Sequence, residues 1–234
     1  MGPDVYNNVV VSTYEELNFF ENVLGFERSH ILAVGLSRWD SASYPKNQIL
    51  VFFTWREYMR NLPKSKIKET LYYQNMLKLI SSSDLKSLLQ KEGYELVVAL
   101  HHVLYEKGLD SDFSGIRCIK YDELSHVKSQ SRILITDFSS MSFDFLFKKM
   151  PVLFFDLDSN DESRFVPRDR EALNNIKSNL TGCGNYCKDV YDLTRVLDLY
   201  IHGGIVEREY SSSFFVSCNE KVNQKLMKEI KLIW

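Results

Sequence analysis

Short apolar runs alternate with segments of helical periodicity along nearly the whole chain. The apolar runs predict strands, and they cover residues 9–11, 31–34, 49–53, 96–100, 118–121, 133–135 and a run from 151. The helical segments follow residue 13 and cover 67–91, 122–128, 190–201 and 220–232. Strands that alternate with helices are typical of a parallel sheet covered by helices on both faces. We therefore predict an α/β fold with a Rossmann-like parallel sheet.

Local signals refine this pattern. Thr13, followed by Glu15 and Glu16, is a typical helix start, because a hydroxyl caps the first turn and acids favour it. The long segment 67–91 contains Ser-Ser-Ser-Asp at 81–84, where we expect it to break. Residues 159–188 are polar with little periodicity, which predicts a long loop.

Ligands of parallel α/β sheets bind beyond the carboxyl ends of the strands. This rule selects the segments that follow the predicted strands, namely residues 35–40, 54–56, 101–102, 136–140 and 156–158. We expect these segments to share one edge of the sheet.

The turn 136–140, Thr-Asp-Phe-Ser-Ser, connects an apolar strand to an amphipathic helix. A helix start offers backbone N–H groups and partial positive charge, so Thr136, Ser139 and Ser140 are candidate phosphate ligands. An ordinary helix cap explains the same residues about equally well. The negative charge of Asp137 disfavours a direct phosphate contact and favours a capping or orienting role.

Two arginines and one histidine also follow predicted strands. Arg38 and Arg56 carry guanidinium groups, which grip two phosphate oxygens at once. His101 could donate a charged hydrogen bond to a leaving phosphate or act as a general acid. The alternatives are solvated surface arginines and a structural loop histidine.

Metal chemistry has weak support in the sequence. Asp156-Leu157-Asp158 imitates an Asp-x-Asp metal motif, but this pattern is common by chance and no partner ligands are evident. The four cysteines do not complete a zinc set, and we interpret them as free thiols in a reducing compartment. We predict no metal site and no required cofactor.

Composition excludes several classes of protein. The chain is 44% apolar and 26% charged, which is ordinary for a globular protein, and its net charge of −2 does not suggest a nucleic-acid partner. No apolar run is long enough to span a membrane, and the start shows no secretory signal. A cytoplasmic location follows, with peripheral association at the inner face of the membrane as a further expectation.

Several motifs together resemble the CDP-glycerol glycerophosphotransferase family, the teichoic-acid primases and polymerases. The matching elements occur in family order at 35–40 (Gly-Leu-Ser-Arg-Trp-Asp), 53–56 (Phe-Thr-Trp-Arg), 100–102 (Leu-His-His), 136–140, 143–144 (Phe-Asp) and 149–155 (Lys-Met-Pro-Val-Leu-Phe-Phe). Phe53 and His102 replace family prolines, and Phe138 replaces a tyrosine. These departures leave room for a different phosphoryl-linked group on the donor.

The resemblance implies a GT-B-type architecture, with residues 1–234 as one domain that binds a CDP-alditol donor. By carry-over, His101 and Arg56 are catalytic and stabilise the leaving CMP, while Asp137 and Asp144 orient the site. The residues that would bind the donor and its pyrophosphate are Arg38, Thr54, Thr136, Ser139 and Ser140.

The acceptor would be a hydroxyl of a cell-surface polymer or a lipid-linked molecule. The family's acceptor-binding half, with its general base, has no counterpart in this sequence, so a separate domain is expected to supply it. A GT-B glycosyltransferase that uses a nucleotide sugar and a non-catalytic adaptor domain remain as alternatives.

Overall fold

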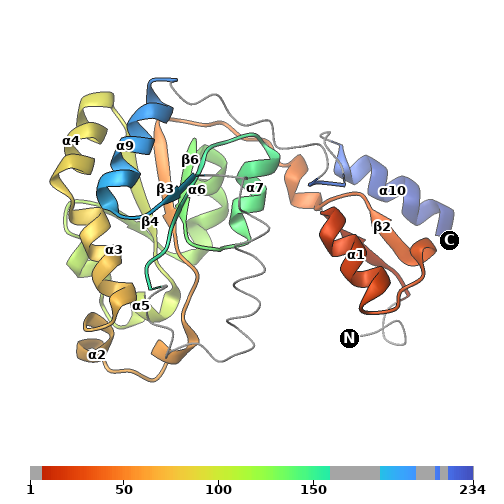
Figure 1. Ribbon diagram of the computed structural model, residues 1–234, viewed down its shortest axis with the longest axis horizontal. Helices are drawn as coiled ribbons and strands as arrows, with labels where there is room; N and C mark the ends of the chain where they lie inside the picture. The colour runs from red at the N-terminus through yellow and green to blue at the C-terminus, as the bar shows by residue number, and fades with distance from the viewer. Residues whose placement is uncertain (1–6, 159–184, 204–213, 217–220, 234) are drawn as a thin grey trace. The chain divides into compact units, whose positions relative to one another are not determined.

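The computed structural model describes residues 7–158, 185–203, 214–216 and 221–233 (Figure 1). Contacts divide the chain into two compact units. The larger unit comprises Ser43–Leu146 and Met150–Arg208, and the smaller comprises Met1–Ala42, Phe147–Lys149 and Glu209–Trp234. The motifs predict one domain over residues 1–234, whereas the six-stranded sheet, which we predict to bind the nucleotide, belongs to the larger unit alone.

The larger unit contains a six-stranded sheet in the order β5-β4-β3-β6-β7-β8, and every neighbouring pair is parallel. Its strands are β3 (Gln48–Phe52), β4 (Glu95–Ala99), β5 (Arg117–Ile119), β6 (Ile133–Thr136), β7 (Val152–Phe155) and β8 (Asn185–Cys187). The predicted Rossmann-like parallel sheet is therefore confirmed.

Helices cover both faces of this sheet. They are α2 (Lys64–Lys68), α3 (Leu71–Ser81), α4 (Ser83–Glu92), α5 (His102–Glu106), α6 (Leu124–Gln130), α7 (Met141–Phe147) and α9 (Val190–Ile201). Figure 1 shows α3, α4 and α9 on one face and α6 and α7 on the other. Because both faces are covered, the central strands β3, β6 and β7 are buried except for the partly buried Phe52 at the end of β3, as their apolar runs require.

The predicted break in the segment 67–91 is present between α3 and α4. The side chain of Ser82 accepts a hydrogen bond from the backbone N–H of Leu85 and so caps α4. The helix ends at Gly93, whose φ of +67° is a left-handed conformation that favours glycine. The serine cluster therefore ends one helix and starts the next.

The smaller unit contains β1 (Val9–Val11) and β2 (Ile31–Ala33), a parallel pair that forms its own two-stranded sheet. Thr13 caps α1 (Tyr14–Asn22) in a reciprocal capping box with Glu16, as predicted for this position. Asp40 ends the 3₁₀ helix η2 (Ser37–Asp40), and its carboxylate accepts three backbone N–H groups at the start of α10 (Val222–Ile233). The unit is thus held by helix caps as well as by apolar packing.

Two expectations about the strands need correction. The strand before residues 35–40 is β2, which pairs with β1 and lies outside the six-stranded sheet, so this segment does not belong to the same sheet edge. The predicted loop 159–188 contains β8, although residues 159–184 lie outside the described part of the chain. Neither sheet membership nor a three-residue edge strand leaves a clear local signal.

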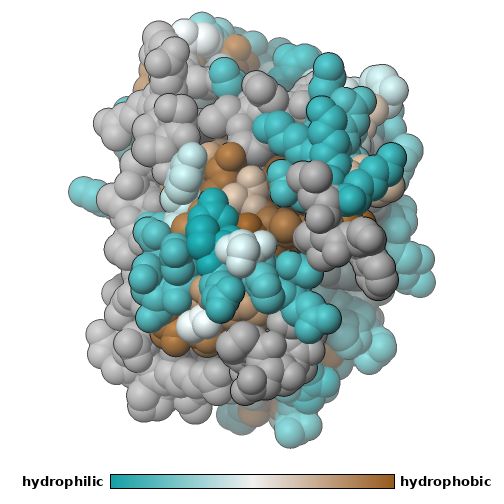
Figure 2. Space-filling model, turned by 90° about the vertical axis from the view of Figure 1, so that its right-hand side faces the viewer, coloured by the Kyte–Doolittle hydropathy of each residue, from teal (hydrophilic) through white to brown (hydrophobic). Residues whose placement is uncertain are grey.

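No helix among the described residues is long and apolar enough to cross a membrane. On the face displayed in Figure 2, apolar side chains lie among hydrophilic ones.

Candidate functional site

A cavity of about 480 Å³ lies in the larger unit at the carboxyl ends of its strands. Residues that follow β3, β4, β5 and β6 form its wall, as the strand-end rule predicts. The lining residues are Phe52, Thr54, Trp55, His101, His102, Tyr121, Phe138, Ser139 and Ser140. The cavity therefore combines aromatic rings with short hydroxyl side chains.

The serine turn contributes both to the cavity and to the helix behind it. The Ser139 hydroxyl accepts the backbone N–H of Met141 at 3.2 Å, which is the interaction of a helix cap. A hydroxyl that accepts a hydrogen bond still has its own proton to donate, so capping and ligand binding are compatible at this position. Ser140 is exposed at the cavity wall.

The two predicted threonine ligands are engaged within the protein. Thr136 is fully buried, and its hydroxyl donates to the carbonyl oxygen of Phe52. Thr54 lines the cavity, but its hydroxyl donates to Asp137 Oδ1 at 2.9 Å. Both threonines connect neighbouring strand ends, and neither presents its hydroxyl proton to the cavity in this structure.

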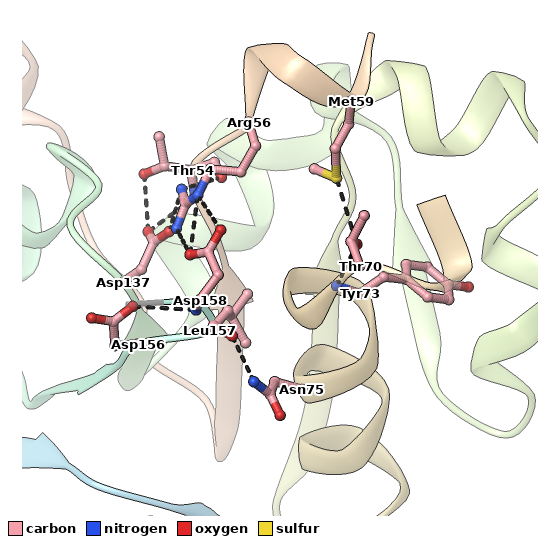
Figure 3. A network of polar contacts seen from close by, with 10 residues as sticks. All are labelled: Thr54, Arg56, Met59, Thr70, Tyr73, Asn75, Asp137, Asp156, Leu157 and Asp158. Atoms are coloured by element: carbon pink, nitrogen blue, oxygen red, sulfur yellow. Dashed lines mark hydrogen bonds and ion pairs between the residues drawn. The ribbon is translucent and has the colours of Figure 1, made fainter. Parts of the chain in front are cut away.

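Arg56 lies behind the cavity wall in a buried cluster with two carboxylates (Figure 3). Its Nη1 is 2.9 Å from Oδ2 of Asp137. Its Nε and Nη2 donate to the two carboxylate oxygens of Asp158 at 3.0 and 2.7 Å. Arg56 is only 4% exposed and is absent from the cavity lining, so the structure does not bring the predicted leaving-group ligand to the cavity.

The charges in this cluster explain the behaviour of its members. Burial alone would lower the pKa of Arg56, but the Asp137 charge and the hydrogen bonds to Asp158 outweigh it and raise that pKa. Burial raises the pKa of Asp137 above its ordinary value, opposed by Arg56 and by the hydrogen bonds from Thr54. The Arg56 charge is thus committed to internal carboxylates.

His101 lies at the cavity wall between two other rings. Trp55 stacks on it at a centroid distance of 4.5 Å and an interplanar angle of 10°, and the His102 ring lies 4.1 Å away. Burial lowers the pKa of His101, and positive charge at His102 and Arg60 lowers it further. Its Nδ1 accepts the N–H of Val103 at 3.4 Å, so a neutral ring carries its proton on Nε2.

The remaining predicted site residues are located as follows. Asp144 on α7 is buried and forms an ion pair of 2.8 Å with Lys128 on α6, which suits an orienting role. Arg38 lies on η2 in the smaller unit, and its role as a phosphate ligand stays a prediction.

Three residues that shape this site are not among the predicted catalytic, donor-binding or orienting residues. Trp55 and Tyr121 line the cavity, and Asp158 holds Arg56. A second cavity, of about 470 Å³, lies beside Asp156 and Asp158 and contains none of the predicted phosphate ligands. Asp158 follows a predicted strand, and this position indicates a place at the sheet edge. The Asp-x-Asp pattern, however, is typical of a metal motif and does not indicate an arginine partner.

The sequence profile of the family described as CDP-Glycerol:Poly(glycerophosphate) glycerophosphotransferase matches residues 3–215. The chain belongs to this family. The match includes residues of both units, and the resemblance inferred from the motifs is confirmed.

The chain is similar to two proteins of Bacillus subtilis (strain 168). They are the minor teichoic acid biosynthesis protein GgaB and the teichoic acid poly(glycerol phosphate) polymerase. GgaB is 26% identical over 149 residues, which are 58% of this chain and 16% of GgaB. The polymerase is 32% identical over 119 residues, which are 47% of this chain and 14% of the polymerase. The chain thus spans less than a fifth of each relative.

Among solved structures, the wall teichoic acid polymerase TagF has the same fold. It superposes with a TM-score of 0.61 at 18% identity, over 98% of this chain and 58% of the TagF chain. The predicted GT-B-type fold is confirmed by this likeness.

Proposed function

We propose that this chain binds the donor nucleotide in an enzyme that transfers an alditol phosphate, of the glycerol- or ribitol-phosphate type, from a CDP-linked donor. The acceptor is a hydroxyl of a cell-surface polymer or a lipid-linked molecule, and CMP is released during teichoic-acid-like or capsule synthesis. The observation that carries this proposal is the cavity at the strand ends, where Ser139, Ser140 and His101 face aromatic rings. A base can stack on such rings while phosphate oxygens accept hydrogen bonds from the polar groups.

Family membership supports the choice of donor, because the family description names CDP-glycerol and poly(glycerophosphate). A variant of TagF, with a TM-score of 0.57 to this chain, was solved after a soak with CDPG. These are properties of the family and of TagF, and we extend them to this chain as part of the proposal.

In the proposed reaction, the acceptor oxygen attacks the distal phosphorus of the donor. A new P–O bond forms, the bond to the bridging oxygen breaks, and CMP leaves with the electron pair. The acceptor proton passes to a general base, which we assign to an acceptor-binding part beyond the cavity described above. Such transfers depend on positioning and on stabilisation of the developing charge.

His101 and Ser139 are suited to the leaving phosphate. A neutral His101 donates from Nε2, because the Val103 N–H occupies its Nδ1. Ser139 donates its own hydroxyl proton while accepting from Met141. Arg56 contributes indirectly, since its charge is neutralised behind the wall by Asp137 and Asp158.

We propose no required metal. The Asp158 carboxylate accepts hydrogen bonds from both Nε and Nη2 of Arg56, which supports a structural role for the Asp-x-Asp motif. If Mn²⁺ raised the thermal stability of the protein in a manner lost in both Asp156→Asn and Asp158→Asn, this part of the proposal would be wrong.

A thermal-shift panel with CDP, UDP and GDP at equal concentrations tests the nucleotide class. A ligand that binds only the native state raises the melting temperature, so we expect the largest increase with CDP. A clear preference for UDP favours a glycosyltransferase that uses a nucleotide sugar. No increase with any nucleotide favours a non-catalytic adaptor domain.

A further inference from the structure

The loop that carries Trp55 is held from both sides by carboxylates of other strands. Residues 53–56 connect β3 to the 3₁₀ helix η3 (Glu57–Met59) and have no regular secondary structure. On one side, the backbone N–H and the hydroxyl of Thr54 each donate to Oδ1 of Asp137 at 2.9 Å. On the other side, Arg56 donates to both oxygens of Asp158 at 2.7 and 3.0 Å.

Trp55 lies between these two attachments and points to the other side of the loop. Its ring stacks on His101 at the cavity wall, and its indole N–H donates to Glu57 at 3.2 Å. Figure 3 shows the Arg56 head group between Asp137 and Asp158, with Thr54 beside them. The backbone position of Trp55 is therefore set by interactions made by its two sequence neighbours.

We propose that Asp158 is a positioning residue of the donor site, which acts through Arg56 to hold the Trp55 ring against His101. A bidentate pair between an arginine and a carboxylate fixes orientation as well as distance. The rings of Tyr72 and Phe138 lie against the guanidinium, with their centroids 5.1 and 5.3 Å from Cζ of Arg56. These cation–π contacts restrict the guanidinium further. A shift of Arg56 moves the adjacent Trp55, because the loop has no strand pairing to resist it.

This role differs from that of an ordinary structural ion pair in its effect on His101. Trp55 covers the imidazole, and burial is the main cause of the lowered pKa of His101. The charged groups that also face His101 are His102, Arg60, Glu57 and Glu106, and a substitution at Asp158 leaves the chemical identity of all four unchanged. Loss of the stack therefore changes the His101 resonance and raises its pKa toward the ordinary value of about 6.5.

The test is proton NMR of the His101 ring in the wild type, Asp158→Asn and the matched control Asp156→Asn. Asp156 is the same residue type two positions away, and Asn at this position keeps the Oδ1 atom that accepts the backbone N–H of Asp158 at 3.4 Å. We expect Asp158→Asn to remove the ring-current shift that Trp55 imposes and to raise the His101 pKa, while Asp156→Asn leaves both near the wild-type values. Should Asp158→Asn not fold, Asp158→Glu keeps the charge but lengthens the side chain, and the same two changes are expected.

The consequence for binding rests on the proposed function and is measured separately, by calorimetric titration with CDP. Mutations that alter a site without touching its ligand typically change affinity by about 2-fold to 30-fold, and we expect Asp158→Asn to weaken CDP within this range. A folded Asp158 variant with unchanged His101 shift and pKa overturns the positioning role. If the wild type binds no CDP, the proposed function fails while the NMR result still decides the coupling.

Discussion

The loop after β3 has a buried side with full charges and a cavity side with neutral polar and aromatic groups. Behind the wall, Arg56, Asp137 and Asp158 form a buried cluster of full charges. In front of it, the cavity presents neutral hydroxyls, aromatic rings and an imidazole whose pKa is lowered. An arginine in a predicted phosphate-binding segment can thus stabilise the fold, while the neutral residues near it line the cavity that we propose binds the ligand.

The largest expected effect comes from removing the charge behind the wall. Arg56→Ala leaves Asp137 and Asp158 buried without their cation, and removal of one partner from a buried pair costs about 3–5 kcal/mol. We expect a loss of this size in the free energy of unfolding, measured by urea denaturation. Ser140→Ala, at the exposed front of the same edge, is the control and should stay within about 0.5 kcal/mol. Similar losses in both variants would remove the distinction between the two sides.

The pH dependence of Asp137 sharpens the same comparison. A carboxyl whose pKa is raised in the folded state binds more protons there than when unfolded, so its contribution to stability falls as pH rises above about 4. The stability of the wild type relative to Asp137→Asn should therefore decrease between pH 4.5 and 7 in urea denaturation. An increase in this stability difference over the same pH range would mean that the attraction of Arg56 lowers the pKa of Asp137 by more than burial raises it.

His101, on the cavity side, should show the opposite sign. Because its pKa is lowered, the folded state binds fewer protons than the unfolded state just below pH of about 6.5, and stability rises with pH there. The advantage of the wild type over His101→Gln should grow as pH rises to this value, measured by thermal denaturation at several pH values. A flat difference would show that His101 is not shielded from water.

The smallest effect is expected at an exposed pair on the same loop. Arg60 and Glu57 form an ion pair in which both side chains are more than half exposed, and such pairs contribute little. Arg60→Ala should leave the melting temperature unchanged within error. A clear decrease would show that the loop depends on surface charge as well as on its buried anchors.

The sequence predicted those parts of the fold that depend on neighbours in the chain. The capping box at Thr13, the helix start at Ser82 and the apolar strand of β3 all follow from local chemistry. Ligands bind at the carboxyl ends of parallel strands, and this rule also predicted that His101, Ser139 and Ser140 lie at one edge of the sheet. In the structure, all three line one cavity.

Pairings across long stretches of sequence were not predictable in this way. Arg56 meets Asp158 from 102 positions away, and both residues looked like candidates for ligand or metal binding because each directly follows a strand. Strands of separate sheets have the same apolar pattern as strands of one sheet. The pattern therefore predicts residues 35–40 at the edge of the six-stranded sheet, although they follow β2 of the two-stranded sheet. Burial and pairing decide these roles, and they are properties of the folded chain.

Calorimetric titration of CDP into the wild type, His101→Ala and Ser139→Ala tests the proposed donor site most directly. We expect measurable binding to the wild type and weaker binding to both variants, because each loses a hydrogen-bond donor at the cavity wall. Removal of one such donor should weaken CDP by about tenfold. Equal affinity in all three proteins would contradict the assignment of this cavity as the donor site.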